Sequence, residues 1–240
     1  MSAPLKVLAL TAALGLLACS HESPADPAAS AAADATAAMA DGSADAAMPA
    51  GHAMAAAATA DVPAPGLQAA LRAMWNGHVV HTRDYAIAVH AGDQAAADAA
   101  AEAVVANAMQ ISDAVAGFYG DAGGARMLEL LGGHWGAVKA LTDAGDTGDT
   151  AARNKAIADL TANAGEIAKF LAAANPNLPE DAVRGLLVAH GAHHAAQIAQ
   201  VMRGDLAGEK TTWTAMQAHM DTIADAMAAA LAKQFPDKAA

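Results

Sequence analysis

The chain has 240 residues, of which 55% are hydrophobic but only 3% aromatic, and its formal net charge is −12. Alanine dominates the composition and is the strongest helix former, and no sustained alternation of branched and polar residues is present, so we expect an all-α fold and no sheet. An acidic chain repels phosphate backbones, which excludes nucleic acid as an expected partner.

Residues 1–18 have the features of a signal peptide for export. Lys6 supplies a positively charged N-terminal region, and the apolar stretch from Val7 to Ala18 is too short to span a bilayer. The stretch ends in LLAC, which resembles the bacterial lipobox, and this resemblance implies that Cys19 becomes the lipidated first residue of the mature protein. Ser20 resembles the sorting signal for the outer membrane of enteric bacteria. We therefore expect a lipoprotein anchored on the periplasmic side of the cell envelope, with an ordinary signal peptide and an incidental cysteine as the alternative.

Residues 19–66 are predicted to be the lipidated cysteine and a disordered tether. The segment is rich in Ala, Asp and Pro, contains no Lys or Arg, and shows no periodic apolar stripe that could be buried. One stretch of it, MPAGHAM (Met48 to Met54), is similar to the Met/His segments of periplasmic copper-handling proteins, and its thioethers and imidazole suit copper. The alternative is low-complexity drift in an alanine-rich linker.

Residues 67–240 are predicted to form one helical domain. From Leu67 onward apolar residues recur at three- and four-residue steps, as in amphipathic helices. The first, third and fifth of these helices carry histidines on the apolar face: His78 and His81, then His134, then His190 and His194. The helices between and after them carry Asn107, Asn163 and His219 in their own apolar stripes.

A spacing of 56 residues connects these helices. His78, His134 and His190 each stand fourteen residues before a Gly-Asp pair, at 92–93, 148–149 and 204–205. Glycine can end a helix in the left-handed conformation, and aspartate can cap the next helix. We expect two further breaks, at 120–124 and 174–181. The pattern predicts a six-helix bundle built from three αα-hairpin repeats with a period of 56 residues.

The hairpins place polar residues at matching heights. Counted from each turn, His78 is level with Asn107, His134 with Asn163 and His190 with His219, and together they define one layer of the core. In one interpretation each histidine is hydrogen-bonded to its level partner, and the layer sets the register of the hairpins. In the other, the layer binds zinc, copper or nickel, and the candidate ligands are His78, His134, His190, His194 and His219.

Two resemblances bear on these interpretations. The stretch LLVAHGAHHAAQIAQVMRGD (186–205) resembles one helix of the DNA-damage-inducible four-helix metalloproteins, which implies His190 and His194 as two metal ligands and His78 as the third. Ala195 and Ala196 depart from the Arg-Gly that this family favours. Over residues 67–236, the segments WNGHVVHTRDY, GFYGDAGG, LTANAGEIAKFLAAANP and AKQFP are similar to a group of uncharacterised small helical bacterial proteins, and this similarity implies architecture alone.

The sequence contains no serine-hydrolase motif, no P-loop, no dinucleotide-binding motif and no zinc-protease motif. We therefore expect a lipid-anchored envelope binding module, with a metal in its polar layer, rather than an enzyme. The alternative is a structural or partner-binding envelope lipoprotein without metal. Catalysis would have to come from ionisable residues beside the helical stripes, namely His81, Arg83, Asp113, Glu166 and Asp225.

Overall fold

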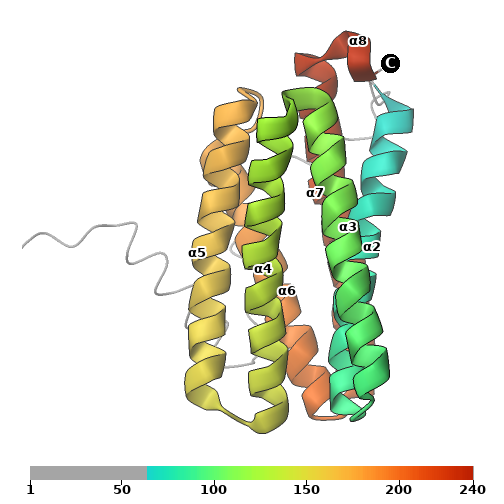
Figure 1. Cartoon of the computed structure of the whole chain (residues 1–240), viewed down its shortest axis with the longest axis vertical. Helices are drawn as coiled ribbons and strands as arrows, with labels where there is room; N and C mark the ends of the chain where they lie inside the picture. Colours follow the sequence, from blue (N-terminus) through green and yellow to red (C-terminus); the bar gives the residue numbers. More distant parts are fainter. Residues whose placement is uncertain (1–63, 240) are drawn as a thin grey trace, which may run out of the picture.

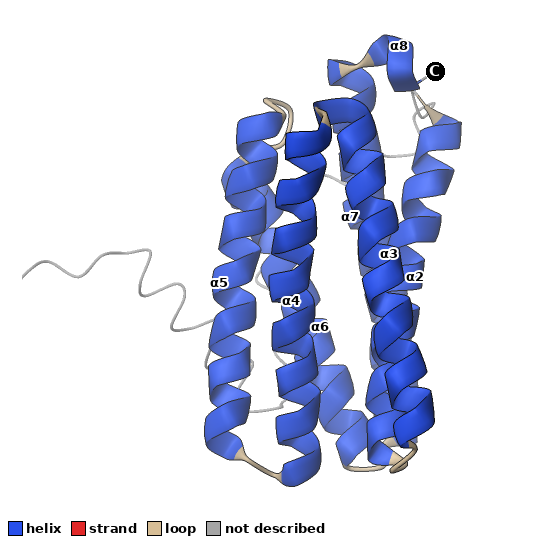
Figure 2. Ribbon diagram, viewed as in Figure 1, coloured by secondary structure: helices blue, strands red, loops and turns tan. Residues whose placement is uncertain are grey.

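The computed structural model describes residues 64–239, which form an all-α bundle of six long helices and a short C-terminal one. Figure 1 labels these helices, and Figure 2 shows that only short loops join them. The elements are α2 (Pro65–His90), α3 (Gln94–Tyr119), α4 (Asp121–Thr147), α5 (Thr150–Ala174), α6 (Glu180–Met202), α7 (Leu206–Gln234) and α8 (Pro236–Ala239). The predicted signal peptide, Cys19 and the MPAGHAM segment lie outside the described residues.

The six long helices follow one another around a closed ring, and three of them also contact one another at its centre. Each helix packs against the next along the chain, and α7 packs back against α2. In addition, α2, α4 and α6 contact one another, so they form the centre, while α3, α5 and α7 lie outside and each covers two inner helices. Among the helices from α2 to α8, none is long and apolar enough to cross a membrane. The predicted all-helical bundle is confirmed.

Three turns at one end of the bundle have the same geometry, as the Gly-Asp pairs predicted (Figure 1). Gly92, Gly148 and Gly204 have φ of +68°, +70° and +68°, the left-handed region that glycine adopts without steric cost. Each following aspartate caps the next helix: its carboxylate accepts from the backbone N–H three residues on, at 2.9–3.0 Å. These local interactions reverse the chain with a two- or three-residue break in helical structure.

The break predicted over 120–124 is much shorter than expected, because only Gly120 is outside a helix. A side chain on Gly124 would place its Cβ 2.8 Å from the Cβ of Ala116 and 2.9 Å from the carbonyl oxygen of Ser112. The hydroxyl of Ser112 donates to Gly124 O at 2.8 Å. The glycines of this segment therefore allow α4 to start against the last turns of α3, and they do not form a loop.

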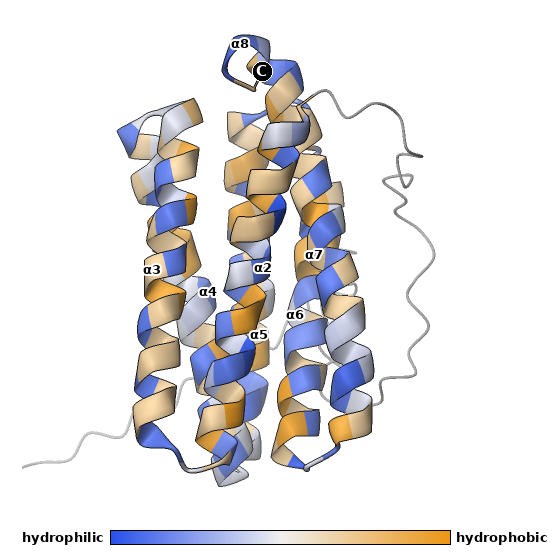
Figure 3. Ribbon diagram, turned by 90° about the vertical axis from the view of Figure 1, so that its right-hand side faces the viewer, coloured by the Kyte–Doolittle hydropathy of each residue, from blue (hydrophilic) through white to orange (hydrophobic). Residues whose placement is uncertain are grey.

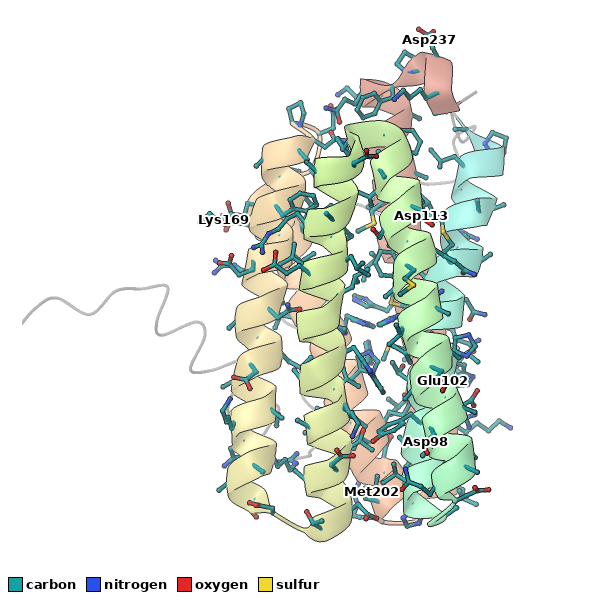
Figure 4. All side chains as sticks on the ribbon, viewed as in Figure 1. Asp98, Glu102, Asp113, Lys169, Met202 and Asp237 are labelled. Atoms are coloured by element: carbon teal, nitrogen blue, oxygen red, sulfur yellow. The ribbon has the colours of Figure 1, made fainter. Side chains whose placement is uncertain are left out.

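The inner helices fill the core in layers. Trp75, Leu131 and Leu187 lie one turn before the three equally spaced histidines, and Thr82, Val138 and His194 lie one turn after them; all six side chains are buried. Apolar and polar residues are mixed along every helix in Figure 3, as amphipathic helices require. The labelled charged residues Asp98, Glu102, Asp113 and Lys169 lie on the exposed faces of α3 and α5 (Figure 4). The histidine layer thus lies between an apolar layer and a mixed layer that contains Thr82 and His194.

Candidate metal centre

Four histidines from the three inner helices meet in the middle of the bundle. His78 is on α2, His134 on α4, and His190 and His194 are on α6. All four are buried, and one ring nitrogen from each lies within 4.8 Å of the others. Three of them come together because α2, α4 and α6 each present a residue at the same height to the common axis. His194 joins from the next turn of α6.

The four rings touch one another across the helix interfaces. The His78 ring centroid lies 5.4 Å from that of His134 and 5.8 Å from that of His190. His134 stacks on His190 at 5.4 Å, and His194 lies 4.4 Å from His190. An ion about 2.0–2.1 Å from four tetrahedral nitrogens holds them about 3.3 Å apart, so small side-chain movements bring these rings to bonding distance. Four histidines close enough to hold a metal ion are therefore present.

The hydrogen bonding of this group is incomplete. His190 Nε2 and His194 Nε2 are 3.0 Å apart, so one of these nitrogens carries a proton and the other accepts it. His134 Nε2 and His190 Nδ1 are buried without any hydrogen-bond partner. Buried polar atoms are normally paired, because an unpaired one loses its hydration without compensation. A bound metal ion would give such unpaired ring nitrogens a partner.

Burial keeps the four imidazoles neutral at ordinary pH. It lowers the pKa of His78 to about 3, with nearby histidines adding to the effect, and the pKa of His134 to about 4, where a polar interaction with Asn163 acts in the opposite direction. The pKa values of His190 and His194 also lie well below the ordinary value, through burial first and then the other histidines. Neutral imidazole is the form that binds a metal, so protons compete weakly at this site.

The predicted pairing of each histidine with the level residue of the next helix is corrected by the structure. Asn107 Nδ2 donates to Met74 O and Asn163 Nδ2 donates to Leu130 O, both at 3.0 Å. Each acceptor is the backbone carbonyl four residues before a histidine. The amides of α3 and α5 thus reach the backbone of α2 and α4, although Asn163 also interacts with the His134 ring and acts to raise its pKa.

His219 belongs to this outer set and lies outside the group of four. Its Nε2 lies 2.8 Å from Leu186 O, and because a carbonyl only accepts, this nitrogen carries the proton. Its ring instead faces His193, at 5.3 Å between centroids, and both rings are only partly buried. The structure thus brings together four of the five predicted ligands, and it places His219 with His193, a residue that the helical stripes did not single out.

A small cavity adjoins three of the four histidines. It has a volume of about 20 Å³ and is lined by His78, His134 and His190 together with Met127, Met220 and Met227. Nothing in the sequence distinguishes these methionines from ordinary core residues. A methionine at helical spacing is ordinarily core, and only the packing of α4 and α7 places these beside the imidazoles.

The charged residues considered for catalysis lie in ion pairs or at the surface. Arg83 binds Glu209 with Nε–Oε1 at 2.6 Å, Asp225 binds Arg72, and Glu166 lies 3.5 Å from Arg126. Asp113 is exposed, and His81 is half-buried. No carboxylate joins the four histidines among residues 64–239, so the site offers neutral nitrogen ligands alone.

Comparisons with family models, with curated proteins and with solved structures found no match for this chain. The two resemblances to helical families, the lipobox and the outer-membrane signal therefore stay predictions. The function is inferred from the geometry of the site.

Proposed function

We propose that this protein is a lipid-anchored, metal-binding module of the bacterial cell envelope, whose core holds one transition-metal ion through His78, His134, His190 and His194. The observation that carries the proposal is the convergence of four buried imidazoles within 4.8 Å, with two buried ring nitrogens left without partners. Imidazole is a good ligand for zinc, copper and nickel.

A core built only for structural purposes would be expected to pair its polar atoms. The interpretation in which asparagines satisfy the histidines loses support, because the asparagine amides donate to backbone carbonyls. Two buried asparagine oxygens, Asn107 Oδ1 and Asn163 Oδ1, are also unpaired. Replacing the four imidazoles by apolar residues would remove this cost, so a compensating ligand gives a physical reason for them to be there.

The proposal includes the internal repeat and the anchor. Three hairpins of one 56-residue unit are supported by the equal offset of their hydrogen bonds, since Asn107 to Met74, Asn163 to Leu130 and His219 to Leu186 each span 33 residues. A threefold arrangement of one hairpin supplies three ligands from one position, and His194 adds the fourth. The LLAC sequence supports attachment through Cys19 to the membrane, with the outer membrane as the proposed location.

The test is elemental analysis of the full chain purified from the cell envelope without chelators, then stripped and reloaded. We expect about one zinc, copper or nickel ion per chain. The variant His134→Ala removes one ligand and should weaken metal binding more than about 100-fold, since even the loss of a residue that only supports a ligand lowers metal affinity about 10–100-fold. A second variant, His194→Val, introduces the side chain that Val138 already provides at the matching position of α4, which favours folding. His90→Ala, an exposed histidine of α2, is the matched control.

A wild-type chain that stays folded and takes up none of these ions would contradict the metal centre. The histidines would then be core residues, and the function would lie on the outer surface, as in the structural or partner-binding alternative. Equal metal content in His134→Ala, His194→Val and wild type would also overturn the assignment of ligands.

A further inference from the structure

We propose that the four-histidine site selects copper(I), and that the methionine-lined cavity beside it is the part of the site that makes this choice. The inference rests on the proposed metal centre and deepens it by naming the ion. It depends on three features: the charge balance of the site, the sulfur atoms beside it, and the size of the cavity.

The charge balance favours a monovalent ion. The four imidazoles are neutral, and no aspartate or glutamate is among the residues that line the cavity. The ionisable groups that influence the pKa values of the four rings are themselves histidines. The cost of moving an ion out of water grows with the square of its charge, so an uncompensated divalent ion costs about four times as much here as a monovalent one.

The sulfur atoms favour a soft ion. Met127 of α4 and Met220 and Met227 of α7 line the cavity together with His78, His134 and His190. Met127 and Met220 are almost completely buried, so their side chains are held within the core. Thioethers bind copper(I) well, whereas zinc prefers thiolate, imidazole and carboxylate. The set of imidazole and thioether groups therefore matches copper(I) better than zinc or nickel.

The cavity provides room for adjustment. Its volume of about 20 Å³ is enough for one water-sized body, yet its lining is mostly apolar, with few groups to bind water. An ion held by the imidazoles can therefore approach the methionine side without displacing core side chains. Copper(I) accepts low and irregular coordination numbers more readily than zinc, which requires four ligands in a closed structural site.

The experiment compares methionines that line the cavity with one that does not. All proteins are full-length chains in which Met48→Leu, His52→Ala and Met54→Leu remove the copper-like segment near the N-terminus. In this background, Met127→Leu/Met220→Leu replaces two lining thioethers with hydrocarbon of similar volume. Met216→Leu is the control, because Met216 is fully buried one turn from Met220 on α7 but does not line the cavity.

Copper(I) affinity is measured anaerobically by competition with bicinchoninate, and zinc affinity by competition with a chromophoric chelator. We expect one copper(I) per chain, bound more tightly than zinc. The double variant should lose copper(I) affinity by about tenfold or more, equivalent to 1.4 kcal/mol, while its zinc affinity changes little. The control should keep both affinities. Thermal unfolding of the metal-free proteins verifies that every variant is folded.

The outcomes separate this inference from the metal centre on which it rests. Tight zinc binding without copper(I) binding overturns the choice of ion and leaves the histidine centre intact. Copper(I) affinity unchanged in the double variant, or a parallel loss for both metals, overturns the role of the methionines. Absence of any bound metal in the folded parent protein contradicts the centre itself.

Discussion

At the scale of single residues, the environment of each histidine decides what it does. His78, His134 and His190 occupy matching positions on the inner helices and face one another, whereas His219 occupies the position of Asn107 and Asn163 and faces an inner backbone. His194 lies one turn after His190 on α6, as Thr82 and Val138 do after His78 and His134, and it adds a fourth imidazole. The same side chain is therefore a candidate ligand in four places and a hydrogen-bond donor to the backbone in another.

The depressed histidine pKa values predict that the metal-free protein loses stability in acid. At these buried positions the unfolded chain takes up protons as the pH falls below about 6.5, whereas in the folded chain His134 titrates only at about 4 and His78 at about 3. The folded state therefore binds fewer protons over this range, and each such histidine costs about 1.4 kcal/mol of unfolding free energy per pH unit.

Urea unfolding of the metal-free protein between about pH 7 and pH 5 measures this loss. His194→Val should show a shallower fall than wild type by the contribution of one histidine, since every other titrating group is common to both. Identical slopes for the two proteins would contradict the burial of a neutral imidazole at position 194.

At the scale of elements, the start of α4 depends on close contact with the end of α3. The two helices are separated only by Gly120, whose φ of +78° is in the left-handed region. This tight connection places α4 so that His134 arrives at the height of His78. Glycines at the junction therefore help to position the site, although they lie several turns away from it.

Gly124→Ala should destabilise the protein by about 1–3 kcal/mol, because the new Cβ would lie 2.8 Å from Ala116 Cβ and the backbone must move. Gly136→Ala is the matched control on the same helix, where no atom lies within 4 Å of the added Cβ. The control should gain about 0.5–1 kcal/mol from helix propensity. Denaturant unfolding of both variants checks the prediction, and a stabilised Gly124→Ala protein would contradict the close contact.

At the scale of the whole molecule, polar interactions close the ring between the last long helix and the first. Glu209 is buried at the start of α7, and both of its oxygens accept from Arg83 of α2, at 2.6 and 3.0 Å. Gln197 of α6 donates to the same carboxylate at 2.9 Å. The hydrogen bond from Arg83 is the main reason that the pKa of Glu209 is lowered. One carboxylate thus connects α2, α6 and α7.

Glu209→Ala should lower the free energy of unfolding by about 2–3 kcal/mol, less than for a fully buried pair because Arg83 keeps some contact with water. Asp159→Ala, which removes the exposed pair with Lys155 within α5, should cost about 0.5 kcal/mol or less. Urea unfolding at neutral pH compares the two. If Glu209→Ala lost no more unfolding free energy than the control, the hydrogen bonds of Glu209 would not be what holds α7 against α2.

The helices, the Gly-Asp turns and their caps were predictable from the sequence, because helical periodicity and turn chemistry act over a few neighbouring residues. The junction at Gly120 was not, since helix breakers suggested a loop where close packing against Ala116 instead required small residues. The candidate site was predictable in part: His78, His134, His190 and His194 follow from spacing on apolar faces. The cavity methionines Met127 and Met220 carried no signal beyond that of ordinary core residues.

By itself, the sequence determined an all-α chain with histidines at equal distances from equivalent turns, because these properties depend on local spacing. Only the tertiary structure decided that α2, α4 and α6 are the inner helices. That choice turns three histidines and His194 toward a common centre, leaves His219 against a backbone carbonyl, and brings methionines of two helices beside the imidazoles. The reason is physical: which faces of the helices meet depends on how all six pack together, and no single helix contains that information.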